Sequence, residues 1–398
     1  MAIIPDQLPG LVAQLSALVN SAHEGSPPYE AMHDIAEKIL YSTRPHMLDP
    51  MQRVFPSVDL AVLRLFIDWH VFDAIPLHGA IAYKDLAGKV AAEEKIIKRY
   101  TWILVARKIL TQTDENHVAH TDVSKLYRRD GPASTAFTFY YDEILPGIIK
   151  LPQYHAHYGR REPVMQNHTP FSFGHEQPDK TVWEIAHQDP RRLKRAMDTM
   201  DICQDGPTIA GVYDFGWVRD VVAKEGDASR MLFVDIGSGK GHVTKAILDQ
   251  NKFIPRERTA LQDREDVMEQ VATLRDPGLT GVRLQSHDFH DEQPIKNALI
   301  YFVCRCLHNY SDEVATKMLT HLGNAMASDS RILIAEIAMS DPPSAFQSAH
   351  DMTMVALGGK ERTAKDWAEL AGRAGLAVKE THGLNSDAWI HVIECVKA

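Results

Sequence analysis

Apolar residues in the first half of the chain recur at the spacing of helices. Between residues 8 and 22, Leu8, Leu11, Leu15 and Leu18 fall on one face of a helix. Residues 32–40 and 58–75 carry similar patterns. The pattern therefore predicts a mostly helical region that extends from residue 7 to about residue 205.

Residues 59–127 follow a more specific order, with three helices and then an alternating segment from residue 110 to residue 122. Three helices followed by a hairpin are typical of a winged-helix domain, so DNA binding has to be considered. The third expected helix, residues 92–110, mixes basic with acidic residues, namely Lys95, Lys98, Arg99, Glu93 and Glu94. Its other face is expected to be buried and comprises Ile96, Ile97, Trp102, Ile103 and Leu104. This mixture favours a packing and dimerising module over a DNA-binding one.

From about residue 230 the spacing of the apolar residues changes. It now predicts short strands that alternate with helices. Runs rich in Val, Ile and Leu, separated by helices, are typical of a mostly parallel, doubly wound sheet. The expected strands lie at residues 231–237, 259–263, 282–289, 298–306 and 331–338, with a closing pair at 376–383 and 388–396. We therefore expect an α/β chain with a helical, winged-helix domain over residues 1–205 and a Rossmann-like domain over residues 206–398.

Composition and charge narrow the class of protein. The chain has 398 residues, a composition typical of soluble globular proteins and a formal net charge of −10, which weighs against a nucleic-acid partner. The N-terminus has no basic stretch typical of a signal peptide, and Arg64, Asp68 and His70 interrupt the most hydrophobic segment. Cys304 and Cys306 are expected to face the same side of one strand as core thiols, not as a metal pair. We expect a reduced, cytoplasmic protein without a membrane span or a metal site.

A glycine-rich turn follows the first expected strand. Gly237, Gly239 and Gly241 would let the backbone turn sharply and approach a ligand closely. The spacing is neither the dinucleotide fingerprint, because His242 replaces its last glycine, nor a phosphate-binding loop, because Val234 replaces the first. A tight glycine turn alone also occurs for packing reasons.

Three carboxylates near the ends of consecutive strands narrow the class of ligand that this part of the chain could bind. Asp235 lies in the strand before the glycine turn, and Asp263 follows 28 residues later, where a carboxylate holds a ribose diol in related sheets. Asp288 is followed by Phe289, an acceptor and an apolar plate suited to adenine. Three acids would repel a pyrophosphate. An adenosyl sulfonium fits them best, although each acid alone could be a helix cap or a solvated loop residue.

These motifs resemble the S-adenosylmethionine (SAM)-dependent O-methyltransferases of the plant caffeic-acid type and their fungal natural-product relatives. The matching segments span about residues 230–375 and include VDIGSGKGHV, LQDREDV, ILIAEI and GGKERT. The N-terminal half matches more loosely, as a helical dimerisation region. The resemblance implies SAM as the cofactor, contacts to it from the loop glycines, Asp263 and Asp288, a further contact from Arg305, and a homodimer.

The segment VCRCLHNYSDE, residues 303–313, places His308 just beyond the end of a strand, where ligands bind in doubly wound sheets. The resemblance makes His308 the general base and Glu336 and Glu361 its carboxylate partners. A histidine, with a pKa of about 6.5, can accept a proton from a phenol, with a pKa of about 10, when a nearby sulfonium lowers the cost. We therefore expect a phenolic, enolic or carboxylic acceptor. The chain departs from the family's His-Asp-Trp because Asn309 and Tyr310 follow the histidine, and His290 replaces an aromatic residue after Phe289.

The sequence gives less specific information about the residues that contact the substrate. The resemblance places Met200 and Met354 near the acceptor, where methionines would form an adaptable apolar wall, although both could be ordinary core residues. Residues 154–179 are rich in histidine, with His155, His157, His168 and His175. Their spacing is not typical of zinc sites, and we expect a segment that lines the substrate.

Two other functions remain open. Some fungal proteins that resemble this family bind SAM but catalyse pericyclic rearrangements or dehydrations, which the retained His308 disfavours. A winged-helix regulator with a degenerate enzyme half is disfavoured by the acidic net charge and by the complete set of His308, Glu336 and Glu361.

Overall fold

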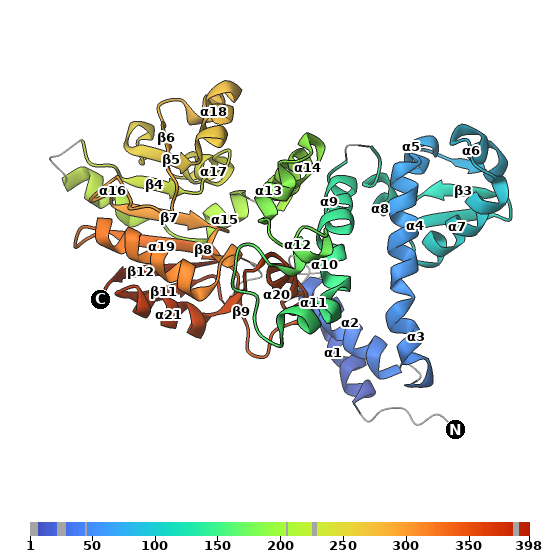
Figure 1. Cartoon of the computed structure of the whole chain (residues 1–398). Helices are drawn as coiled ribbons and strands as arrows, with labels where there is room; N and C mark the ends of the chain where they lie inside the picture. Colours follow the sequence, from blue (N-terminus) through green and yellow to red (C-terminus); the bar gives the residue numbers. More distant parts are fainter. Residues whose placement is uncertain are drawn as a thin grey trace. The chain divides into compact units, whose positions relative to one another are not determined.

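The computed structural model describes residues 7–21, 29–43, 46–129, 131–203, 206–224, 229–384 and 390–398. The chain divides into two compact units (Figure 1). Unit 1 comprises residues 1–146 and 186–202, and unit 2 comprises residues 147–185 and 203–398. This division differs from the expected boundary near residue 205 in one segment, because residues 147–185 pack with the C-terminal unit.

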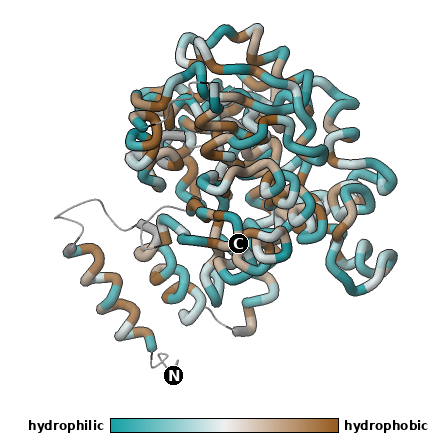
Figure 2. The backbone as a smooth tube through the Cα atoms, turned by 90° about the vertical axis from the view of Figure 1, so that its left-hand side faces the viewer, coloured by the Kyte–Doolittle hydropathy of each residue, from teal (hydrophilic) through white to brown (hydrophobic). Residues whose placement is uncertain are grey.

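Unit 1 is mostly helical, as the apolar spacing predicts. In its first helix, α1 (Leu8–Ser21), Leu8, Leu11, Leu15 and Leu18 are half-buried and the residues between them are exposed. Figure 2 shows hydrophobic and hydrophilic stretches alternating along the helix next to the N-terminus. The helices that follow along the chain are α2 (Tyr29–Thr43), α3 (Asp49–Val54), α4 (Pro56–Asp68) and α5 (Val71–Ala74). The late helix α14 (Pro190–Cys203) belongs to the same unit.

Salt bridges connect α14 to the middle of unit 1. Arg192 on α14 pairs with Glu143 at 2.9 Å, and Arg195 pairs with Asp142 at 3.0 Å. Arg64 on α4 donates two hydrogen bonds to the same Asp142 at 2.9 Å. Because Glu143 is buried, its pairing with Arg192 also satisfies a charge that would otherwise be costly to bury.

The expected helices and hairpin of residues 59–127 are present. Helices α4, α6 (Tyr83–Lys89) and α7 (Glu94–Ala106) are followed by the antiparallel strands β2 (Leu110–Asp114) and β3 (His117–His120). A short strand that the pattern did not predict, β1 (Ala80–Ala82), pairs with β3. The assignment of this region as a winged helix stays a prediction.

The buried face of α7 agrees with the prediction only in part. Ile97 and Leu104 are fully buried and Ile96 and Ile103 are half-buried, but Trp102 is 50% exposed. The prediction for Trp102 was wrong because this ring lies on the polar side of α7, where the ammonium of Lys98 approaches it at 6.0 Å.

Unit 2 contains a seven-stranded sheet with the order β11-β12-β8-β7-β4-β5-β6. The strands are β4 (Phe233–Ile236), β5 (Thr259–Asp263), β6 (Arg283–Ser286), β7 (Ile300–Cys304), β8 (Arg331–Glu336), β11 (Leu376–His382) and β12 (His391–Lys397). The five strands from β6 to β8 are parallel to one another, and β12 is antiparallel to both β8 and β11. Each predicted strand is present, although β6, at the edge, is only half-buried.

Helices cover both faces of this sheet (Figure 1). One apolar core joins the sheet to α19 (Asp312–Ala325) and α21 (Ala364–Arg373). The other core joins it to α15 (Gly206–Val212), α16 (Gly216–Lys224) and α17 (His242–Gln250). Alternation along β4 explains this, because Phe233 points into the second core and Val234 into the first. The doubly wound, mostly parallel sheet is therefore confirmed.

Unit 2 also contains the segment that precedes α14. Its helices are α11 (Leu151–Tyr158), α12 (Pro170–Gly174) and α13 (Val182–Ala186), and α12 packs on the later helix α20 (Ala345–Leu357). Short strands β9 (Ala338–Met339) and β10 (Arg362–Thr363) form a separate parallel pair. Across the described ranges of the chain, no helix combines the length and apolar character needed to cross a bilayer.

Candidate active site

The glycine turn after β4 adopts a conformation that only glycine tolerates well. Gly237, Gly239 and Gly241 have φ values of 68°, 52° and 76°. A Cβ atom at Gly237 would lie 2.7 Å from the sulfur of Cys306, and one at Gly241 would lie 2.7 Å from Leu261. A Cβ at Gly239 would meet no atom within 4 Å. Gly237 and Gly241 are thus required for packing, whereas the backbone at Gly239 faces open space that a ligand can approach.

Asp235 supports this turn from its buried side. Its side chain is 2% exposed and accepts a hydrogen bond at 2.5 Å from the hydroxyl of Thr244, in the first turns of α17. Burial raises the pKa of Asp235 to about 7, although the bond from Thr244 lowers it. The carboxylate therefore links β4 to α17, on either side of the glycine turn.

Asp263, at the end of β5, contacts the turn directly. Its two carboxylate oxygens accept hydrogen bonds from the backbone of Gly239 and of Arg264, both at 2.8 Å. Burial raises the pKa of Asp263, and these two backbone bonds oppose that increase. The turn and the acid predicted to hold the ribose are therefore held together before any ligand binds.

Asp288 and Phe289 lie just beyond the end of β6, which closes at Ser286. Asp288 is exposed, and its carboxylate accepts the backbone N–H of His290 at 2.9 Å. Phe289 is half-buried and packs edge-on against Tyr310, with 5.8 Å between ring centroids. Tyr310 thus occupies the aromatic position after the histidine, where the family commonly has a tryptophan.

The backbone at Arg305 explains a wrong prediction about the cysteines. Arg305 has a φ of 50°, in the left-handed region, so the alternation of side chains stops after Cys304. Cys304 packs into one core of the sheet, whereas Cys306 packs against the other, next to the glycine turn. The two thiols therefore do not face the same side.

His308 lies in a short 3-10 turn (Leu307–Asn309) that follows β7, and its side chain is 5% exposed. Its Nδ1 is 2.8 Å from Oε1 of Glu361. Burial alone would raise the pKa of Glu361, but the contacts from His308 and His350 outweigh it and lower this pKa to about 2. Glu361 is therefore ionised at neutral pH, in contact with the imidazole.

Glu336 ends β8 and is completely buried. Its Oε1 accepts the backbone N–H groups of Leu307 at 2.9 Å and of His308 at 3.3 Å. Its Oε2 lies 3.5 Å from Nδ1 of His308. Burial raises the pKa of Glu336, while the imidazole acts in the opposite direction. Glu336 thus holds the backbone of the histidine turn, whereas Glu361 holds its ring.

Two adjacent glycines bring Glu361 to His308. Gly358 ends α20 with a φ of 84°, a common way to stop a helix. A Cβ atom at Gly359 would lie 2.1 Å from the carbonyl oxygen of His308. Lys360 then donates its backbone N–H to that same oxygen at 2.8 Å. The glycines in GGKERT therefore allow this loop to lie directly against the histidine turn.

Arg362 secures the same contact from within the protein. Its side chain is fully buried and pairs with Asp312 at 2.9 Å. It also donates to the carbonyl oxygens of Leu307 at 3.3 Å and of Tyr310 at 2.9 Å. One guanidinium therefore holds both ends of the turn that carries His308.

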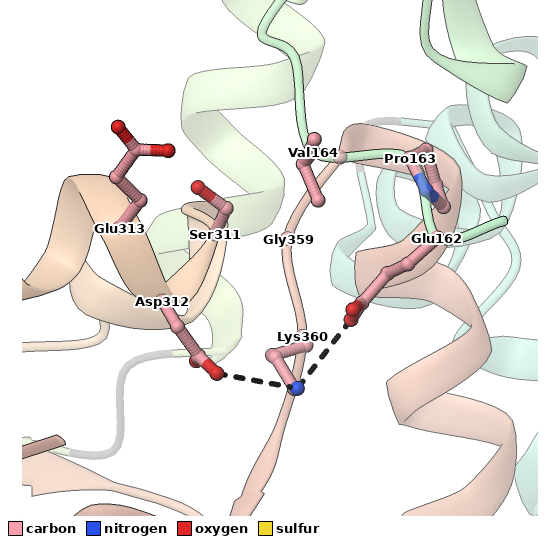
Figure 3. A pocket seen from close by; sticks show the side chains of 9 residues that line it. Glu162, Pro163, Val164, Ser311, Asp312, Glu313, Gly359 and Lys360 are labelled. Atoms are coloured by element: carbon pink, nitrogen blue, oxygen red, sulfur yellow. Dashed lines mark ion pairs between the residues drawn. The ribbon is translucent and has the colours of Figure 1, made fainter.

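A small charged cavity of about 140 Å³ lies on the outer side of this loop. Lys360 crosses it, with its ammonium 3.4 Å from Glu162 and 3.6 Å from Asp312 (Figure 3). Sites for drug-sized ligands usually have volumes of about 300–1,000 Å³. This cavity is too small for SAM or for an aromatic substrate, and its charges anchor the loop.

The predicted substrate residues are divided between the units. Met354 lies on α20 in unit 2 and is 6% exposed, whereas Met200 lies on α14 in unit 1 and is 38% exposed. The histidines of residues 154–179 contact aromatic rings: His157 packs on Tyr158 with 4.5 Å between centroids. Within the described residues, these histidines form no group of three metal ligands.

Sequence reasoning missed His350. This residue lies on α20 with its side chain 11% exposed, and its Nδ1 is 3.0 Å from Oε1 of Glu361. Its ring is nearly parallel to that of His308, at an interplanar angle of 21° and a centroid distance of 6.3 Å. A histidine inside an amphipathic helix gives no signal of such a contact, because the glycine loop after the helix creates it.

Comparison with known proteins identifies the family of this chain. A family model for the O-methyltransferase domain matches residues 217–377. Methyltransferase cfoD of Aspergillus candidus is 36% identical in an alignment of 387 positions that covers 95% of this chain and 95% of that protein. Methyltransferase pvhD of Talaromyces variabilis is 34% identical over 322 residues, which are 81% of this chain and 89% of that protein.

Solved structures share the whole fold. The crystal structure of OxaC has a TM-score of 0.85 at 21% identity and covers 98% of this chain and 99% of that one. LepI in complex with SAM has a TM-score of 0.82 at 20% identity and covers 98% of this chain and all of the other. The predicted fold and family are therefore confirmed: the chain belongs to the SAM-dependent O-methyltransferase family, in its fungal natural-product branch.

Proposed function

We propose that this protein transfers the methyl group of SAM to a phenolic, enolic or carboxylic oxygen of a small natural product, with His308 as the general base. The observation that carries this proposal is the buried His308 ring, which is held through Nδ1 by an ionised Glu361. A nucleophilic oxygen reacts far faster after its proton has left, and a fixed imidazole is suited to accept that proton.

The contact with Glu361 determines which nitrogen of His308 acts. Because Glu361 is ionised, Nδ1 of the neutral ring carries the hydrogen and Nε2 is left as the proton acceptor. After proton transfer the imidazolium is stabilised by Glu361 at 2.8 Å and by Glu336 at 3.5 Å. Glu361 therefore holds the ring, and both glutamates lie close enough to stabilise its charge, as a carboxylate does in a catalytic triad.

The cofactor residues fit an adenosyl sulfonium. The open backbone at Gly239 leaves room for close approach, and Asp263 beside it has the acceptor oxygens that a ribose diol needs. Phe289 would cover the adenine, with Asp288 and Arg305 as further contacts. Asp235 supports the glycine turn from the interior. When bound, SAM supplies an electrophilic methyl group on a positively charged sulfur.

For the acceptor we propose a polyketide-type or aromatic molecule that contacts Met354 and Met200. We also propose that the protein acts as a homodimer in the cytoplasm. Exposed apolar side chains on α2, α3 and the start of α4 support association through unit 1, because such clusters usually mark interaction surfaces. The clearest examples are Leu40, Met51, Val54, Phe55 and Val58, which are between 49% and 65% exposed.

A second candidate is a SAM-binding pericyclase of the same fold. The structural likeness to the protein described as a pericyclic reaction enzyme, with a TM-score of 0.82 at 20% identity, keeps this alternative open. A rearrangement moves no methyl group and needs no base beside the sulfonium. The intact arrangement of His308, Glu336 and Glu361 therefore favours methyl transfer.

The test is incubation of the purified protein with SAM labelled on its methyl group and a panel of phenolic, enolic and carboxylic polyketides. Methyl transfer predicts a labelled product and S-adenosylhomocysteine in equal amounts. Binding of SAM without either product, together with an isomerised acceptor, would contradict the proposal and support the pericyclase. Acceptors with their oxygen already methylated are the matched controls.

A further inference from the structure

One carboxylate oxygen of Glu361 lies close to two imidazole rings. Its Oε1 lies 2.8 Å from Nδ1 of His308 and 3.0 Å from Nδ1 of His350. The two rings come from different elements, the turn after β7 and the helix α20, and the three side chains are largely buried. His350 therefore belongs to the same buried group as the proposed base, although the established family assignment gives it no role.

The contact of His350 differs in kind from that of His308. The nitrogen of His308 has the geometry of a hydrogen bond to Glu361, whereas Nδ1 of His350 is close but is not aligned for one. The second oxygen of Glu361 has no hydrogen-bond partner, and both rings lie against the same oxygen, Oε1. The two imidazoles thus compete for one negative charge.

Other charged groups around this pair are fixed by their own contacts. Asp351, next to His350 on α20, accepts the backbone N–H of Glu361 at 2.8 Å, and its pKa is raised by burial. Glu336 faces His308 from β8. The remaining charges that act on these acids are those of Lys360, Glu162 and Arg305.

A shared counter-ion couples the protonation of the two rings. A positive charge on His350 repels a proton on His308, and a neutral His350 that turns its N–H to Oε1 weakens the attraction of Glu361 for the imidazolium. Both effects have the same sign. Each makes His308 hold a proton less strongly than it would with Glu361 to itself.

We propose that His350 is a positioning residue that shares Glu361 with His308, limits the proton affinity of the base and keeps it available at neutral pH. The proposal rests on the role of His308 proposed above. It predicts that the two histidines titrate as a coupled pair. The apparent midpoint of the pH–rate profile is then a property of both rings.

The experiment is the pH–rate profile of methyl transfer by the wild type, His350→Phe and His350→Asn. Without the competing imidazole, His308 retains its proton to higher pH, so the rising limb should shift by about half to one unit toward alkaline pH. The rate at the alkaline plateau should be largely retained. His350→Asn keeps an N–H donor but cannot become charged, so its shift should be smaller and in the same direction.

Phe346→Ala is the matched control. Phe346 lies one turn earlier on α20, is 59% exposed and packs on the ring of His350, but it carries no proton. Its replacement should leave the midpoint unchanged. Unshifted midpoints in both His350 variants would overturn the proposal, and a loss of rate that is equal at every pH would show a purely structural role.

A second measurement keeps this test separate from the proposed function. NMR titration of the His308 ring protons, assigned with His308→Ala, follows the coupling without any turnover. An alkaline shift of the His308 titration in His350→Asn supports the shared carboxylate even if no acceptor is methylated. An unchanged His308 titration would contradict it even if methyl transfer is observed.

Discussion

At the scale of single residues, two buried acids of the site have pKa values that are shifted in opposite directions. Glu361 is kept ionised by two imidazoles, and its pKa falls to about 2. Asp235 has a hydroxyl as its hydrogen-bonding partner, and its pKa rises to about 7. The difference follows from the neighbours, because desolvation favours the neutral acid unless a positive group lies close by.

Asp235→Asn should therefore change stability in a pH-dependent way. The pKa of Asp235 is higher in the folded state than its unfolded value of about 4, so ionisation destabilises the wild type as pH rises from about 4 to about 7. The amide can still accept the bond from Thr244. Above pH 7 the variant should be more stable by up to about 4 kcal/mol, with no advantage below pH 4.

Urea unfolding of both proteins without SAM, at several pH values, measures this difference. A constant difference between pH 4 and pH 8 would contradict the assignment. The amide should also weaken SAM binding, because the turn it supports would lose a negative charge near a cationic ligand.

Residue types alone pointed to much of the candidate site. Gly237, Gly239, Asp263 and His308 are recognisable because a glycine turn and polar residues at the ends of buried strands are unusual. Their roles stay predictions. The contact of His350 with Glu361 was not predictable, because it depends on where a helix stops and how a loop returns.

At the scale of elements, the loop after α20 is the part that assembles the proposed base. Gly358 stops the helix, Gly359 allows contact with the carbonyl of His308, and Arg362 anchors both sides. A sequence shows these residues as a short motif. The structure shows why glycine is needed there, because a side chain at Gly359 would collide with the carbonyl oxygen of His308.

Gly359→Ala tests this explanation. The added Cβ would lie 2.1 Å from the carbonyl oxygen of His308, a distance that real Cβ atoms do not show, so the loop has to move. We expect a loss of stability of about 1–3 kcal/mol and a fall of about 10²-fold in kcat, because Glu361 leaves its place beside the imidazole.

Gly372→Ala is the control for that substitution. Gly372 lies within α21, where a Cβ would meet nothing within 4 Å, so alanine should be neutral or stabilise by up to about 1 kcal/mol. Thermal unfolding and steady-state kinetics of both variants provide the measurement. Equal behaviour of the two would contradict the role assigned to Gly359.

Element prediction succeeded where one face of a strand or helix is clearly apolar. Each predicted strand of the large sheet is present, and α1 shows the expected face. It failed where local backbone geometry intervened, as at Arg305, whose left-handed conformation separates the environments of Cys304 and Cys306. It also missed β1, a strand of three residues that forms only through pairing with β3.

At the scale of the whole molecule, the two units have different surfaces. Unit 2 has two large apolar cores on either side of a sheet and a smaller one around Met268, and its exposed apolar side chains, such as Leu274 and Phe346, come from separate elements. Unit 1 has its own core around α4 to β3 but exposes a group of large apolar side chains on α2, α3 and α4. Composition could not show this difference, because it depends on which face of each helix is covered.

The proposed homodimer gives a prediction at this scale. Light scattering of the purified protein should give about twice the mass of one 44.7 kDa chain. Met51→Glu combined with Phe55→Glu should shift the protein toward the monomer, because a charge within an apolar contact is costly. Glutamates at Val123 and Leu126, which are also exposed in unit 1, are the control. A monomeric wild type would contradict the proposal.

The central claim is that His308 removes the proton from the oxygen that becomes methylated. The direct measurement is the single-turnover rate of label transfer from SAM at pH 7.5 by the wild type and by His308→Asn, with SAM affinity measured in parallel. We predict a fall of about 10²–10⁴-fold in rate, the usual contribution of a general base, with SAM affinity retained. Transfer at the wild-type rate by the variant would contradict the account.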